Sequence, residues 1–157
     1  MNKKNKGFTL IEMLVVVAVI GLLASLILVG LSSFRTRGRD TRRVADTKEV
    51  QNGLELYYMK NGQYPVVSGG DATMRWAALE QALVEAGIGV TKLPQDPTAP
   101  TRSYDYGAPS DGQKYVIAVP IEDPSSNASL LQTDIDGNLY GVDCGDSSDD
   151  QIYCVGM

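Results

Sequence analysis

The feature that most constrains this chain is an apolar run near its N-terminus that contains a single acid. Between Phe8 and Leu31 the only charged residue is Glu12, and no proline interrupts the 24 residues. A helix of this length spans about 36 Å at about 1.5 Å per residue, more than the roughly 30 Å of a bilayer's hydrocarbon core. The run therefore predicts a membrane-spanning helix over residues 8–31.

A secretory signal peptide is the competing interpretation of this N-terminus. Three lysines lead directly into the apolar run: Lys3, Lys4 and Lys6. The apolar part of a signal peptide is about 7–15 residues long and ends at a small-residue cleavage site, whereas this run is longer and continues into helix-forming sequence. The pattern favours a retained helix over a removed signal peptide.

Glu12 needs a physical reason to lie in such a run. A carboxylate at the centre of a bilayer costs on the order of 2.5–3.5 kcal/mol, so such a group usually has a partner or a task. Because Glu12 lies only about one helical turn inside the run, its side chain can also snorkel to the membrane interface. Both interpretations are open from the residues alone.

Charge divides the rest of the chain into a basic stalk and an acidic body. Residues 32–60 hold seven Lys or Arg against four acids, and residues 61–157 hold four against fourteen. A protein that binds nucleic acid presents a positive face to the phosphates, so the acidic body argues against that function. The arginines beyond the apolar run are expected to snorkel to lipid headgroups, with contacts to acidic neighbours as the alternative. They are Arg35, Arg37, Arg39, Arg42 and Arg43.

The stalk is predicted to continue the same helix. Four apolar residues follow the i, i+4, i+7, i+8 spacing of a helix with one buried face: Val50, Leu54, Tyr57 and Tyr58. Further upstream only Val44 and Ala45 are apolar, which predicts a stretch in solvent or against neighbouring molecules. Asn61-Gly62, followed by Pro65, predicts the end of the helix.

The remainder predicts a compact body with a second helix and short strands. The helix is expected over about Met74–Ala86, capped by Asp71 or Thr73 and ended by Gly87. Strands are expected over about Ser103–Tyr106, Lys114–Ile121, Ser129–Thr133 and Asn138–Val142. Pro120 lacks a backbone donor, which places the end of its strand at a sheet edge. The prolines of LPQDPTAPT predict an ordered or extended linker between the helical and strand portions.

Catalytic motifs are absent from the sequence. It contains no histidine, which removes Ser-His-Asp and Cys-His arrangements and the HExxH metal site. It also contains no Walker loop and no GxGxxG between a strand and a helix. We therefore expect that the chain is not an enzyme.

One acidic cluster offers the hard oxygen ligands that Ca²⁺ prefers. Its candidate ligands are Asp134, Asp136, Asn138 and Asp143, with Asp146, Asp149 and Asp150 nearby. The spacing fails the EF-hand pattern, and Asp-Gly turn chemistry explains DIDGN without a metal. The expectation is that no cofactor is bound, with calcium as the alternative.

Two cysteines, Cys144 and Cys154, lie near the C-terminus. With nine residues between them and no histidine in the chain, they fit no zinc pattern. A disulfide formed in an oxidising compartment is favoured over two free thiols.

The stretch KGFTLIEMLVVVAVIGLLASLIL resembles the N-terminus of the prepilin family, which comprises type IV pilins and the pseudopilins of type II secretion. The segment LELYYMKNGQYP is similar to the helix exit of pseudopilins and related short pilins. The resemblance covers residues 3–65 well, and residues 66–157 match only in LPQDP, the strand-rich ending and the paired cysteines. It implies the pilin fold, an α+β fold in which a long N-terminal helix with a transmembrane first half packs on a small antiparallel β-sheet head domain.

The resemblance also implies how the chain is processed and divided. A membrane prepilin peptidase would cut between Gly7 and Phe8 and methylate the new amine of Phe8, leaving 11 basic and 19 acidic residues and a net charge of −8. The implied parts are a leader (1–7), a transmembrane and filament-core half of the helix (8–31), the soluble half of that helix (32–61), and a globular head with a C-terminal cysteine loop (62–157).

The resemblance gives Glu12 a partner. In the family the corresponding glutamate is proposed to neutralise the N-terminal amine of the adjacent subunit during assembly. Two opposite charges about 4 Å apart attract by roughly 4 kcal/mol at an effective dielectric near 20, which offsets much of the burial cost. The chain departs from the family at Val29, where a proline is frequent, so unwinding of the helix near this point is not implied.

The implied function is a structural subunit of a type IV pilus or a type II secretion pseudopilus. Its implied partners are copies of itself and other pilins in a helical filament, prepilin peptidase, the inner-membrane assembly platform and the membrane. The chain is expected in the bacterial cytoplasmic membrane as a single-pass precursor and then in an extracytoplasmic filament, at the cell surface or in the periplasm. The alternative is a single-helix membrane-anchored domain that displays an extracytoplasmic binding body, with calcium as a candidate ligand.

Overall fold

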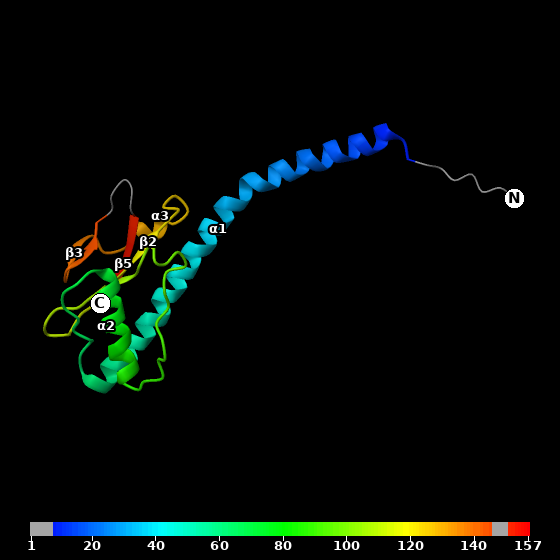
Figure 1. Ribbon diagram of the computed structural model, residues 1–157. Helices are drawn as coiled ribbons and strands as arrows, with labels where there is room; N and C mark the ends of the chain where they lie inside the picture. Colours follow the sequence, from blue (N-terminus) through cyan, green and yellow to red (C-terminus); the bar gives the residue numbers. More distant parts are fainter. Residues whose placement is uncertain (1–7, 146–150) are drawn as a thin grey trace. The chain divides into compact units, whose positions relative to one another are not determined.

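The computed structural model describes residues 8–145 and 151–157, and for residues 26–31 of the first helix it describes the backbone alone. The predicted leader, with Gly7, lies outside these residues, as do Asp146, Asp149 and Asp150. The elements are α1 (Leu10–Asn61), α2 (Ala72–Glu85), β1 (Asp105–Gly107), β2 (Val116–Ile121), α3 (Ala128–Leu131), β3 (Gly137–Leu139), β4 (Val142–Cys144) and β5 (Gln151–Gly156) (Figure 1).

The chain forms two compact units, one ending at Thr36 and the other running from Arg37 to Met157. In the first unit, every side chain from Phe8 to Ser25 is exposed. Among the residues that the structure describes, no helix combines the length and the apolar character needed to cross a membrane.

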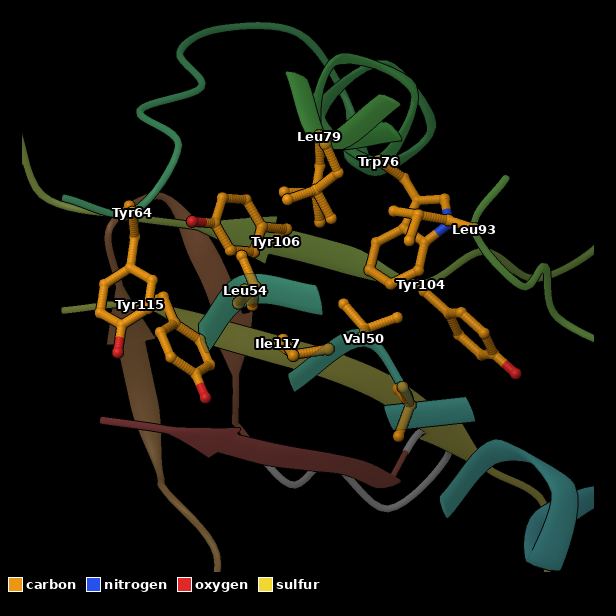
Figure 2. Close-up of a cluster of buried hydrophobic side chains, with 13 residues drawn as sticks. Val50, Leu54, Tyr64, Trp76, Leu79, Leu93, Tyr104, Tyr106, Tyr115 and Ile117 are labelled. Carbon is orange, nitrogen blue, oxygen red and sulfur yellow. The ribbon is translucent and has the colours of Figure 1, made fainter. Parts of the chain in front are cut away.

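The second unit packs helices on one face of a small antiparallel sheet. Its three strands are ordered β1-β2-β5, with Asp105 opposite Ala118 and Val116 opposite Gly156. Figure 2 shows Val50 and Leu54 of α1 and Leu79 of α2 in the same buried cluster as Ile117 of β2. Helix and sheet therefore share a core, which confirms the α+β fold expected from the sequence.

The opposite face of the sheet is covered by a two-stranded hairpin, β3–β4. Side chains alternate along β2, so Ile117 faces the helices while Val116 and Ala118 pack with Val142 and Cys144 of the hairpin. The body thus has two apolar layers, one on each side of the same central strand.

The predicted ends of both long helices and the cap at Asp71 are confirmed, although α2 begins at Ala72 rather than at Met74. Gly62 follows α1 with a positive φ of 73°, and its backbone N–H donates to the carbonyl of Tyr58 at 2.8 Å. Asp71 caps α2 by accepting the Met74 N–H at 2.9 Å. Gly87 ends that helix, again with positive φ.

Two of the predicted strands are wrong. The sequence predicts a strand over residues 129–133, but they overlap α3, whose N-cap is Asn127. The Asn127 carbonyl accepts the backbone N–H groups of Leu130 and Leu131, and its side chain donates to Asp40 and to the carbonyl of Asp123. The segment expected as one strand over 138–142 contains a turn, because Tyr140 and Gly141 both take positive φ. This pair closes a two-residue hairpin between β3 and β4.

The strand β5 was not predicted, and it overlaps the expected cysteine loop and runs two residues beyond Cys154. Its presence makes β2 the central strand of the sheet. Even so, β1 pairs only with Val116–Ala118, so at Pro120 the ladder continues on the β5 side alone. The proline-rich linker is ordered, and the carbonyl of Pro94 accepts the indole N–H of Trp76 at 3.0 Å.

Candidate functional site

The N-terminus of α1 is a reciprocal cap built by Thr9 and Glu12. The Glu12 Oε2 accepts hydrogen bonds from the backbone N–H and the hydroxyl of Thr9, both at 2.7 Å, and the Glu12 N–H donates to the Thr9 hydroxyl at 3.3 Å. This is the capping box of the pattern T-x-x-E, which satisfies donors at a helix start. Sequence reasoning missed it, although the spacing was visible in FTLIE.

The surface around Glu12 is apolar. Glu12 lines a shallow hollow together with Phe8, Ile11, Val15 and Val16, and the exposed fractions of Phe8 and Ile11 are 81% and 69%. Within one chain, Thr9 is the hydrogen-bonding partner described for this acid. The arrangement leaves a carboxylate and a wide apolar surface open to another molecule.

A second group of charges lies inside the body, centred on Arg43. The guanidinium is fully buried and contacts three carboxylates. Its Nε and Nη2 donate to Asp96 at 2.6 and 3.0 Å, and its Nη1 lies 2.7 Å from Asp40 and 2.6 Å from Glu122. We call Arg43, Asp40, Asp96 and Glu122 the buried charge cluster.

The loop that follows β2 binds the buried charge cluster and the arginines next to it. Asp40 accepts the backbone N–H groups of Glu122 and Asp123 at 3.0 and 2.8 Å. Arg39 binds Glu122 through two nitrogens, and Arg37 contacts Asp123 at 3.1 Å. The stalk residues 37–43 are therefore tied to the loop over two helical turns.

The pKa shifts follow from these contacts. Burial alone raises the pKa of Asp96, but hydrogen bonds from Arg43 and Thr98 outweigh it and hold that pKa below its usual range. The hydrogen bond from Arg39, helped by Arg43, lowers the pKa of Glu122 to about 2. Burial opposes the charge on Arg43, yet its three carboxylate partners raise its pKa. These shifts favour the charged forms of Arg43, Asp96 and Glu122 near neutral pH.

The cluster bears on two expectations for the stalk. Upstream of Val50 one face of the helix is buried against the body rather than solvated. Acids of the same chain bind Arg37, Arg39 and Arg43, which is the alternative that the sequence left open for these arginines. The signal was a stripe of positions spaced three or four apart that runs on into the apolar face: Asp40, Arg43, Thr47, Val50 and Leu54.

The predicted disulfide between Cys144 and Cys154 is present and joins β4 to β5. The calcium candidates do not gather around one point among the described residues, where no group of three acids is placed to hold a metal. Asp134 accepts the Cys154 N–H at 3.0 Å, Asp143 accepts the Gly145 N–H at 3.0 Å, and Asp136 is exposed. Asn138 lies opposite Asp143 in the hairpin. Calcium binding stays an untested prediction.

Comparison with known proteins finds a matching family and several relatives. Residues 2–28 match the family described as the prokaryotic N-terminal methylation motif. The chain is 34% identical to a type II secretion system core protein G of Aeromonas hydrophila over 99 residues, which are 61% of this chain and 69% of that protein. It is 30% identical to the protein of the same name from Escherichia coli over 145 residues, 87% of this chain and 86% of the relative. A third protein of this name, from Dickeya chrysanthemi, is 27% identical over 97% of this chain and 87% of its own length.

Proposed function

Because the chain belongs to the family of type II secretion system core protein G, we propose that it is a structural pseudopilin that polymerises into a type II secretion pseudopilus. The observation that carries the proposal is the exposed apolar surface of residues 8–25, with one carboxylate at its start. A surface of this kind needs a lipid or protein partner, because large exposed apolar patches mark interaction sites. The role is mechanical, and no chemistry is assigned to the chain itself.

The proposal chooses the pseudopilus over the type IV pilus on the strength of the relatives. Three relatives carry the name of the secretion protein. Each of them aligns with this chain over at least two thirds of its own length. The partners are then copies of this chain and other pilins, with the inner-membrane assembly platform, and the route runs from a membrane-anchored precursor to a periplasmic filament.

Processing is the first step of the proposed route. The match to the methylation motif supports cleavage between Gly7 and Phe8 by prepilin peptidase and methylation of the Phe8 amine. The intact mass of the chain expressed with the peptidase tests this step. We expect the loss of residues 1–7 and the gain of one methyl group, whereas an uncut chain favours the simple anchored domain.

Assembly is the second step, and it assigns Glu12 to the amine of a neighbouring subunit. In a single chain the carboxylate caps the helix through Thr9, so helix capping and assembly have to be separated. Glu12→Gln separates them, since glutamine also serves in a capping box but carries no charge. Glu12→Ala removes both properties.

The test compares polymer yield and helix content for the two variants. We expect both to reduce polymer yield at least tenfold, because an ion pair worth roughly 4 kcal/mol near a dielectric of 20 is lost. Circular dichroism should show native helix content for Glu12→Gln. Polymers of Glu12→Gln that form at the normal rate and quantity would contradict the assigned role.

A further inference from the structure

The body carries a small apolar pocket between α2 and the loop that precedes β1. Trp76 and Tyr104 are buried in its wall, and Ala77 of α2 and Ala99 of the loop are exposed at its margin. The two alanines leave space above the aromatic side chains. Pro100 continues the apolar lining on the loop side.

The polar groups of the two aromatic residues are already satisfied inside the body. The Trp76 indole N–H donates to the carbonyl of Pro94 at 3.0 Å, and the Tyr104 hydroxyl donates to Asp46 at 2.7 Å. The two rings meet edge to face at 5.3 Å between centroids. What they offer to the pocket is therefore ring surface rather than hydrogen-bonding groups, so the pocket suits an apolar occupant.

The volume of the pocket limits the size of that occupant. It measures about 200 Å³. A dry cavity of about 150 Å³ holds a benzene molecule, so this pocket admits one aromatic ring, whereas sites for small-molecule ligands are usually about 300–1,000 Å³. The pocket is suited to a single side chain from another protein molecule.

The chain itself has a largely exposed aromatic side chain outside the pocket. Phe34, in the first unit, is 71% exposed. It lies beyond the apolar run, between Ser33 and Arg35, so it is not simply one more residue of that run. The flanking Arg35 is exposed as well, and among the described residues no ion pair is formed by it.

We propose that the pocket receives Phe34 of a second copy of this chain. The inference rests on the proposed function, since a helical filament needs a contact that joins two different surfaces of identical subunits. Charge is complementary between the two surfaces, because residues 32–60 of the stalk carry seven Lys or Arg against four acids and residues 61–157 of the body carry four against fourteen. The pocket wall itself contains Glu80 and Arg102 beside the apolar side chains, so the complementarity is that of stalk and body rather than of the pocket alone.

A cross-linking experiment locates the contact. Both native cysteines are held in the disulfide, so Phe34→Cys and Ala77→Cys can be combined in the full chain and treated with a short bismaleimide after polymerisation. We expect covalent dimers and longer ladders. The matched control combines Phe34→Cys with Val84→Cys, an exposed position farther along α2, and should give few dimers. Equal cross-linking of both pairs, or a cross-link confined to one chain, would overturn the proposal.

Filling the pocket tests the same contact without cross-linking. Ala77→Trp occupies the space, while Ala78→Trp adds the same side chain at the next exposed position of α2, which does not line the pocket. We expect at least a tenfold loss of polymer for Ala77→Trp and for Phe34→Ala, normal polymer for Ala78→Trp, and unchanged thermal unfolding in all three.

The remaining outcomes distinguish a failure of the proposed function from a failure of the pocket contact. If the unmodified chain forms no polymer, the proposed function fails and the contact with it. If the unmodified chain polymerises and Ala77→Trp does so equally well, the pocket contact is wrong and the pseudopilin function stands. If Phe34→Ala weakens only the membrane retention of the monomer, Phe34 is an interfacial anchor instead, as aromatic residues often are.

Discussion

The two halves of α1 belong to one helix but differ in which side chains they bury. Residues 10–25 carry apolar side chains that are all exposed, whereas residues 37–54 bury a stripe that begins with charges, at Asp40 and Arg43. In the first half the side chains have no partner body in the described chain. In the second half Arg43 meets opposite charges at 2.6–3.0 Å, and one of them is Asp40 of the same helix.

The difference shows that the polarity of a helix face does not decide its burial; the available partners do. A buried charge is tolerated when its neighbours neutralise it and satisfy its hydrogen bonds, and here Asp96 and Glu122 supply both to Arg43. An exposed apolar face persists when its partners are other molecules. The first half is therefore built for assembly, and the second half holds the body together.

The largest loss of stability is expected for a substitution at Arg43, in the second half of α1. Arg43→Ala leaves three carboxylates without their central cation, so we expect the second unit to lose about 3–5 kcal/mol of unfolding free energy in denaturant titrations. The control is Arg42→Ala, whose side chain is 66% exposed and which should change stability by less than about 0.5 kcal/mol. Equal effects of the two variants would contradict the role given to the buried charge cluster.

Acid should lower the unfolding free energy of the second unit. The pKa of Glu122 is lowered from 4.5 to about 2 in the folded chain, so its contribution to stability is present above about pH 4.5 and is lost as the pH falls toward 2. The full loss is on the order of 3 kcal/mol for a shift of this size. Thermal unfolding between pH 6 and pH 2 measures it.

The variant Glu122→Gln supplies the reference for that titration. It should begin less stable at pH 6 and lose less on acidification, because one of the carboxylates with a lowered pKa is absent. A pH profile parallel to that of the unmodified chain would show that Glu122 does not carry the effect.

The disulfide is a further difference between the two units. It joins the β3–β4 hairpin to β5 and has no counterpart in the described part of the first unit. Replacing both Cys144 and Cys154 by serine should cost about 2–3 kcal/mol for a loop of this length in the chain-entropy model. Unfolding with and without a reducing agent measures the loss. Reduction should not further destabilise the double variant.

The smallest effect is expected for a leucine in the first half. Leu22 is 65% exposed, so Leu22→Ala should change the unfolding free energy of the second unit by less than about 0.5 kcal/mol. The matched change Leu54→Ala, at a fully buried position of the same helix, should cost about 2–5 kcal/mol. Similar values for the two leucines would mean that the halves of α1 do not differ as described.

Much of the fold followed from local patterns. The end of α1 at Asn61 and the cap of α2 at Asp71 were predicted because turn and cap residues act within a few positions of themselves. The misread segments were those with mixed local signals. Asn138–Val142 has strand-like residues, but the positive φ of Tyr140 and Gly141 folds it into a hairpin.

By itself the sequence determined the apolar N-terminal helix, the acid at its start and the cysteine pair, because run length, residue type and spacing are local properties. Only the tertiary structure decided that Arg43 meets Asp96, 53 positions away, and that Asp40 caps the backbone near Glu122, 82 positions away. The helical spacing of Asp40 and Arg43 indicates a buried face, but nothing in either segment identifies the distant partner. Only folding brings these residues within hydrogen-bonding distance. Their burial in the body then strengthens the interaction between their charges.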